Sequence, residues 1–195
     1  MMNTQNIVEQ VTFLFRQFGN ETYGEGMSVL SHSVQSAEIA EASGLDDELV
    51  MAALLHDIGH IYPLAKDEHV EMMDLFGTRH HEDIAKSFLG SYFLPERLIE
   101  PIAMHVDAKR YLCAADQNYI NDLSEASRTT LMYQGGPMNE EEQHAFKNHE
   151  FFNEAIEIRK IDDAAKQENY FVGDSKLNYW MWRLEEYIAS LKTIS

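Results

Sequence analysis

Helical spacing of apolar residues runs through almost the whole chain, and it restricts the fold more than any other feature of the sequence. In the N-terminal segment the positions i, i+4, i+7, i+8 and i+11 are Ile7, Val11, Leu14, Phe15 and Phe18, which share one face of a helix. No segment of strand length alternates apolar and polar residues. We therefore predict an all-α fold.

Capping residues set the boundaries of the predicted helices. Ser28 can cap the second helix, and Asp46 or Asp47 can start the third. Asn139 with Glu142 has the pattern of a capping box. The first five predicted helices span about 7–18, 28–42, 46–57, 78–91 and 95–111, the last with Pro95 as its first helical residue. Two shorter helices are predicted next, the second ending at Gly135. The last three predicted helices span 140–148, 150–169 and 175–192. Residues 61–78 are expected to form a loop or a loop with a short helix.

The length and composition indicate one globular domain over residues 1–195. The chain is 45% apolar and has no internal repeat, linker or low-complexity segment. Fifteen Lys and Arg against 33 Asp and Glu give a net charge of −18. That balance argues against binding to nucleic acid, which requires a basic surface, and against an anionic membrane surface. A small anionic substrate remains compatible, because a pocket can be locally basic in an acidic protein.

The sequence favours a soluble protein of the cytoplasm. The single cysteine, Cys113, excludes an internal disulfide and suits a reducing compartment. Residues 1–17 lack a basic leader and carry Glu9 within their apolar stretch, unlike a secretory signal. The longest apolar run, Leu49 to Leu55, has seven residues, whereas a bilayer requires about 20.

Histidines and aspartates stand at positions that could bring them into the core. His56 and Asp57 directly follow the longest apolar run, and placing two such side chains in a core is costly unless they are paired or bind a metal. Imidazole and carboxylate without thiolate suit iron, manganese or zinc. Four histidines with two aspartates exceed one tetrahedral zinc and are about right for two octahedral ions that share a carboxylate. A single histidine on an apolar helix is more often a satisfied core residue, so the residues alone leave both interpretations open.

His56-Asp57, preceded by Ala-Ala-Leu-Leu and followed by Ile-Gly-His, resembles the signature of the HD-domain superfamily. Other stretches resemble its branch of PhnZ-like phosphonate oxygenases, namely 105–114, 134–138, the Arg159-x-x-Asp162-Asp163-x-Ala165-Lys166 segment and Tyr23-Gly24-Glu25. The resemblance covers roughly residues 23–166. Asp107 departs from the pattern, and the loop at Tyr23 is one residue shorter.

The resemblance implies a helical bundle with a dinuclear centre of two iron ions, Fe(II) and Fe(III), in its core. The implied ligands are His32, His56, Asp57, His81, His105 and Asp162, with Asp57 bridging the irons. His80 competes with His81, and we favour His81 because His-Glu is the family pattern and the spacing 105 − 81 = 24 agrees with the family. Asp163 is expected to support the site rather than bind metal.

The resemblance also implies a reaction, in which O2 cleaves the C–P bond of 2-amino-1-hydroxyethylphosphonate to give glycine and phosphate. Lys109, Ser127 and Arg159 are the expected phosphonate-binding residues, since a dianion requires cationic and hydroxyl donors. Lys109 lies one helical turn after the implied ligand His105 and Arg159 lies three residues before Asp162, which places both cations on the ligand faces of their helices.

The remaining expected site residues surround the substrate and the metal ligands. Glu25 is expected to bind the substrate amine, and Tyr23 to act as a lid that occupies an iron until substrate arrives. His60 and Gln134 are expected to lie behind the ligands and to orient them or the substrate.

The sequence is compatible with three alternative functions. The first is the same chemistry on the trimethylammonium analogue of the phosphonate, giving glycine betaine and phosphate. The second is a metal-dependent HD phosphohydrolase that uses water, and the third is an HD module that binds without catalysis. The sequence leaves the stereochemistry at the hydroxyl carbon and the oligomeric state open.

Overall fold

The computed structural model describes residues 5–22, 24 and 26–192, and throughout these residues the regular elements are helices. They are α1 (Gln5–Phe18), α2 (Val29–Ala42), α3 (Asp47–Leu55), η1 (Ile58–His60), η2 (Pro63–Lys66), α4 (His81–Gly90), α5 (Glu96–Ala115), α6 (Tyr119–Asp122), α7 (Glu125–Tyr133), α8 (Glu140–Lys147), α9 (Phe152–Ala164) and α10 (Asp174–Leu191), where η denotes a 3₁₀ helix. The predicted all-α fold is confirmed. Within the described ranges no helix is both long enough and apolar enough to cross a bilayer.

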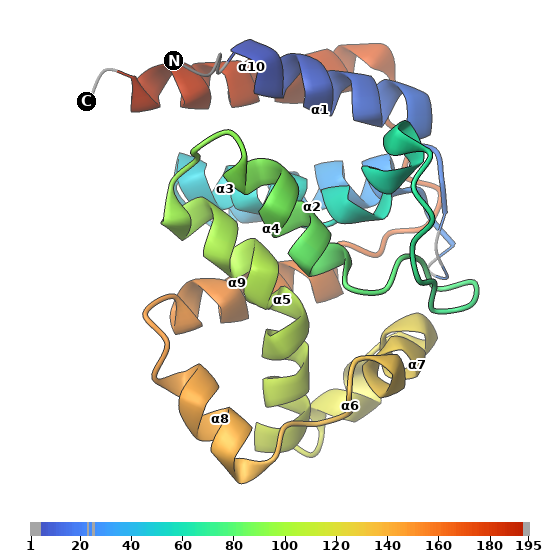
Figure 1. Cartoon of the computed structure of the whole chain (residues 1–195), viewed down its shortest axis with the longest axis vertical. Coiled ribbons are helices and arrows are strands. Elements are labelled where there is room, and N and C mark those ends of the chain that lie inside the picture. Colours follow the sequence, from blue (N-terminus) through green and yellow to red (C-terminus); the bar gives the residue numbers. More distant parts are fainter. Residues whose placement is uncertain (1–4, 23, 25, 193–195) are drawn as a thin grey trace.

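Helix α3 forms the centre of the main core. Every residue from Leu49 to Leu55 is buried. A helix that is apolar on all sides is stable only when other elements surround it, and here α2, α5, α9 and α10 all pack on α3. Figure 1 shows α2 and α3 beneath the adjacent helices α1 and α10, with α5 and α9 below them. The end of α3 therefore delivers His56 and Asp57 into the interior.

Helix α5 extends from the main core into a second, smaller apolar cluster. The middle of α5 contributes Met104 and Ala108 to this cluster, and Phe146 of α8 and Ala155 and Ile156 of α9 pack on them. Figure 1 shows α6, α7 and α8 around this lower half of α5. This arrangement places α7 opposite the middle of α5 and α9, where the expected phosphonate-binding residues lie.

The predicted helix caps are confirmed in detail. The side chain of Ser28 accepts a hydrogen bond from the backbone N–H of Ser31 at the start of α2, and Asp46 caps α3 through the N–H of Leu49. At α8 both hydrogen bonds of the capping box between Asn139 and Glu142 are present. These interactions are local, which is why the sequence alone could locate them.

Four boundaries in three helices differ from the prediction. α4 begins at His81 rather than near Thr78, because His80 adopts a left-handed conformation (φ 59°) that interrupts the helix before it. Pro95 lies just outside α5 with an extended ψ of 143° instead of occupying its first position, and α5 continues past residue 111 to Ala115. α9 ends at Ala164, several residues before the expected end.

Gly59 lies in η1 where the chain runs directly against the start of α4. A Cβ atom there would lie 1.9 Å from the carbonyl oxygen of His81 and 3.0 Å from the backbone nitrogen of Ala85. We expect Gly59→Ala to force η1 and α4 apart and to lower the free energy of unfolding by roughly 1–3 kcal/mol or more, measured by urea denaturation. Gly90→Ala is the control, because a Cβ at Gly90 meets nothing within 4 Å. Equal effects of the two substitutions would contradict this packing.

Candidate metal centre

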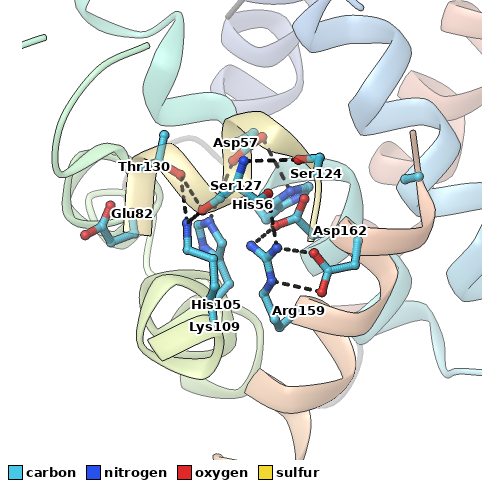
Figure 2. A network of polar contacts seen from close by, with 12 residues as sticks. His56, Asp57, Glu82, His105, Lys109, Ser124, Ser127, Thr130, Arg159 and Asp162 are labelled. Atoms are coloured by element: carbon cyan, nitrogen blue, oxygen red, sulfur yellow. Dashed lines mark hydrogen bonds and ion pairs between the residues drawn. The ribbon is translucent and has the colours of Figure 1, made fainter. Parts of the chain in front are cut away.

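The structure brings together the six residues that were expected to be metal ligands. Each is buried, although they come from five separate parts of the chain. His32 lies on α2, His56 and Asp57 follow α3, His81 is the first residue of α4, His105 lies on α5 and Asp162 on α9. Figure 2 shows His56, Asp57, His105 and Asp162 from close by.

The two carboxylate oxygens of Asp57 face two different pairs of histidines. Oδ2 of Asp57 lies 3.5 Å from Nε2 of His32 and 3.5 Å from Nε2 of His56. Oδ1 lies 3.4 Å from Nε2 of His81 and 3.8 Å from Nε2 of His105. We call His32, His56 and Asp162 the first donor group and His81 and His105 the second donor group, with Asp57 between them.

Atoms within each donor group lie close together. The Nε2 atoms of His32 and His56 are 3.2 Å apart, and those of His81 and His105 are 3.0 Å apart. Oδ1 of Asp162 lies 3.2 Å from Nε2 of His32. The first donor group therefore has a carboxylate of its own, whereas the second shares only that of Asp57.

All four histidines direct Nδ1 toward a backbone carbonyl and Nε2 toward the cluster. In three of them the carbonyl belongs to the residue three positions earlier, and His32 uses the carbonyl of Ala165 after α9. The distances are 2.9 Å for His32 to Ala165, 2.8 Å for His56 to Ala53, 3.2 Å for His81 to Thr78 and 2.7 Å for His105 to Ile102. A carbonyl only accepts, so in a neutral ring Nδ1 carries the proton and Nε2 keeps a lone pair. Facing lone pairs this close require a proton or a cation between them, and the donor set therefore fits metal ions.

The pKa shifts favour neutral imidazoles at His56 and His105 and a proton on His32, which lies beside Asp162. Burial and the neighbouring His81 and His56 lower the pKa of His105 to about 3, and burial also lowers the pKa of His56. Burial opposes the charge on His32, but the hydrogen bond and charge of Asp162 outweigh it and raise the pKa of His32. Burial likewise opposes the charge on Asp57, yet the imidazoles around it hold its pKa well below the usual range. The first donor group thus carries negative charge that a bound cation can neutralise.

His60 and His80 differ from the six donors. Nδ1 of His60 accepts a hydrogen bond from the backbone N–H of Thr78 at 3.0 Å, so the proton of the neutral ring lies on Nε2, 4.0 Å from Oδ1 of Asp57. Its ring stacks on that of His81 with centroids 4.0 Å apart. The side chain of His80 is 58% exposed and faces Glu82 and Asp83. These positions fit a supporting role for His60 and exclude His80 from the cluster.

Three cationic side chains converge beside the donor groups. Nζ of Lys166 donates to Oγ of Ser127 at 2.9 Å, Nη2 of Arg159 approaches the same oxygen at 3.4 Å, and Nζ of Lys109 donates to Oγ1 of Thr130 at 2.9 Å. Burial and the charge of Arg159 lower the pKa of Lys109 to about 7. We call Lys109, Arg159 and Lys166, with Ser127 and Thr130, the basic cluster. Figure 2 shows its members Lys109, Arg159, Ser127 and Thr130.

Arg159 connects the basic cluster to the first donor group. Its Nη1 donates to Oδ2 of Asp162 at 2.6 Å, while Nε and Nη2 donate to the two oxygens of Asp163. Tyr119 donates to Asp163 and accepts from Arg159. Asp163 therefore holds Arg159 in place, which fits the supporting role expected from the sequence. Asp162 faces the other residues of the first donor group.

A cavity lies beside the donor groups and the basic cluster, and further residues that the sequence predicted for the site line it. Its lining includes His60, Lys109, Ser127, Gln134 and Arg159 together with the apolar side chains of Met73, Phe76, Val106 and Ala126. Tyr23 and Glu25 lie outside the described residues. Sequence reasoning missed Lys166, Thr130 and Tyr119 as members of the site. Lys166 belongs to the 159–166 segment that resembles the family, and this resemblance could have identified it as a member of the site.

Comparison with known proteins places the chain in a family. Residues 29–163 match the model of the HD domain. The chain is 38% identical, over 92% of its length and 88% of the relative, to a [1-hydroxy-2-(trimethylamino)ethyl]phosphonate dioxygenase (glycine-betaine-forming) of Leisingera caerulea. It is 38% identical, over 85% of its length and 83% of the relative, to a hydroxymethylphosphonate dioxygenase of Gimesia maris (strain ATCC 29201 / DSM 8797 / 534-30).

A third relative is the uncharacterized protein L432 of Acanthamoeba polyphaga mimivirus, 35% identical over 96% of this chain and 85% of that protein. The chain belongs to the HD-domain family. Within that family it belongs to the PhnZ-like oxygenases, the group that contains the phosphonate dioxygenases.

The neighbouring histidines 80 and 81 offer a matched pair for testing the cluster. We expect His81→Ala to lose about one metal ion per chain, because it removes half of the imidazole donors of the second donor group. His80→Ala is expected to keep the stoichiometry of the unmodified protein, since His80 is exposed and lies outside the cluster. Elemental analysis of metal per chain measures both, and the reverse result would contradict the assignment.

Proposed function

We propose that the protein is an oxygenase that uses two iron ions and O2 to cleave the C–P bond of a 1-hydroxyphosphonate, with release of phosphate. The observation that carries this proposal is the single carboxylate of Asp57, whose two oxygens face two separate imidazole pairs beside a buried basic cluster. The two relatives named as phosphonate dioxygenases support it.

The six donors suit a dinuclear iron centre. His32, His56 and Asp162 would hold one ion, His81 and His105 the other, and Asp57 both. Nitrogen and oxygen donors without thiolate are compatible with iron and unsuited to soft metals. Iron bound there would activate O2, while the four electrons that reduce O2 would come from the substrate as its hydroxyl-bearing carbon is oxidised to a carboxylate, and the protein would supply position and charge.

The basic cluster would bind the phosphonate and hold it next to the donor groups. Two lysines and an arginine with serine and threonine hydroxyls give charge-assisted hydrogen bonds to a dianion. Lys109 and Arg159 are both buried, so their charges act in a medium that weakens them less than water does. Arg159 also holds Asp162, and a phosphonate on Arg159 would therefore lie directly beside the first donor group.

For the organic part of the substrate, we favour 2-amino-1-hydroxyethylphosphonate, which O2 would convert into glycine and phosphate. A trimethylammonium group is recognised best by several aromatic rings, and Phe76 is the one Phe, Tyr or Trp among the described residues that line the cavity. The trimethylammonium analogue, converted into glycine betaine and phosphate, is the second candidate because a relative carries that name.

Residues around the cavity would complete the site. Glu25 would bind the ammonium group and Tyr23 would act as a lid that admits O2 only to the loaded site. Gly24 between them lies where a Cβ would be 2.4 Å from Cδ1 of Phe76, so Gly24 itself lies against the cavity lining. His60 and Gln134 would orient the substrate and the ligands.

Oxygen uptake together with phosphate release tests the proposed reaction. Protein purified and loaded with iron without air is offered 2-amino-1-hydroxyethylphosphonate, its trimethylammonium analogue and hydroxymethylphosphonate in parallel. We expect one phosphate for each O2 consumed, with glycine from the first substrate, and the substrate with the highest kcat/KM identifies the organic group. Phosphate release from phosphoesters without O2 consumption would instead indicate a hydrolase and contradict the proposal.

Lys109→Met tests the basic cluster separately from the metal. We expect the KM for the phosphonate to rise about 10-fold or more, the loss that follows from removing one buried charge-assisted contact of about 1.5–3 kcal/mol. Both irons should remain bound. Lys160→Met is the control, since the side chain of Lys160 is 58% exposed and pairs with Glu157. A KM unchanged by Lys109→Met would remove Lys109 from the phosphonate site.

A further inference from the structure

We propose that Glu82 is a positioning residue for the second donor group. Its carboxylate would attract the Nδ1 proton of His81, hold that ring in place and strengthen binding of the metal at the second donor group. This inference rests on the proposed dinuclear metal centre and assigns a role to a residue behind it. Glu82 would help the second donor group to hold a metal ion although that group carries less negative charge than the first.

A buried oxygen of Glu82 lacks a conventional partner. Glu82 is the second residue of α4, and its side chain is 12% exposed. Its Oε2 atom is buried and makes no hydrogen bond within the described part of the chain. Arg79, the arginine closest in sequence, donates to Glu71 through Nη1, and its own Nε is buried without a hydrogen bond in the described part of the chain. Because burying a carboxylate oxygen without a donor costs free energy, its position calls for a physical reason.

That oxygen lies 3.5 Å from Nδ1 of His81. The carbonyl partner of this nitrogen, Thr78, is 3.2 Å away, whereas the other three histidine donors reach their carbonyls at 2.7–2.9 Å. The Nδ1 proton of His81 thus lies between a long carbonyl contact and a carboxylate. In the described chain no other histidine of the cluster has a carboxylate at Nδ1.

The charge of the two donor groups explains what this contact would achieve. The first donor group has the carboxylate of Asp162 in addition to Asp57, whereas the second has two neutral imidazoles and only a share of Asp57. A carboxylate that accepts the Nδ1 proton of a ligand histidine makes Nε2 a stronger donor and fixes the ring orientation. Glu82 would therefore add, from behind His81, negative charge that the second donor group lacks.

Figure 2 places Glu82 at the edge of the network, with its carboxylate turned away from the basic cluster. Nδ1 of His80 lies 3.9 Å from Oε1 of Glu82, and Arg79, Asp107 and Arg110 line the same surface cavity as Glu82. Glu82 is thus separate from the phosphonate-binding residues, and its removal should leave phosphonate binding to the basic cluster unchanged.

Glu82→Gln tests the inference, because it removes the charge and keeps the shape. Asp83→Asn is the matched control, since Asp83 lies in the same first turn of α4 and its side chain is 72% exposed. Competition with a graded chelator measures the affinity of each ion. We expect Glu82→Gln to weaken one of the two ions by about 10–100-fold, the usual cost of losing such a partner, and Asp83→Asn to leave both unchanged.

The midpoint potential of the iron pair provides a readout that a loss of packing alone would not move. Loss of a nearby anion stabilises the reduced state, so the potential should rise in Glu82→Gln and stay constant in Asp83→Asn. Two ions held at unaltered affinity and potential in Glu82→Gln would overturn the inference and leave the proposed function intact. Equal weakening of both ions would also overturn it. Unmodified protein that binds no second ion would instead overturn the proposed dinuclear centre.

Discussion

The contact on which the site depends is the one between the Asp57 carboxylate and the imidazoles on either side of it. Four imidazoles and two carboxylates, all of them buried, meet around Asp57, and such an arrangement is unfavourable unless cations neutralise it. The backbone fixes the orientation of the four imidazoles, because a carbonyl oxygen near each Nδ1 leaves Nε2 pointing toward Asp57. Helix α3 supplies the central carboxylate because it is apolar on all sides and must end in the interior.

The second constraint is the coupling between the metal cluster and the basic cluster. Arg159 is paired with Asp162 on one side and lies within reach of Ser127 on the other. A chain with a net charge of −18 thus brings three basic side chains together at one place, the buried Lys109 and Arg159 and the half-buried Lys166. Such concentration attracts small anions without making the surface basic, which agrees with the proposed small phosphonate substrate.

Much of the fold was predictable, since it depends on local interactions. Ser28, Asp46 and the Asn139–Glu142 pair cap their helices as expected, because caps involve residues three positions apart. The start of α4 was not predictable from spacing alone, because it depends on the left-handed conformation of His80. That conformation also separates His80 from His81, so that one side chain is exposed and the other lies in the core.

The composition of the site was predictable in part. The six donors and Lys109, Ser127 and Arg159 were identified through family resemblance, and the structure brings them together. Their division into two groups, and the participation of Lys166, Thr130, Tyr119 and Glu82, required side-chain directions on helices far apart in sequence. Spacing along a single helix carries no information on these contacts.

The most direct measurement of the central claim is a crystal structure of protein loaded anaerobically with iron, with anomalous scattering recorded at the iron absorption edge. The account predicts two iron peaks on opposite sides of the Asp57 carboxylate, one bound by His32, His56 and Asp162 and the other by His81 and His105. A single peak, or an iron bound by His60 or His80 in place of these residues, would contradict it.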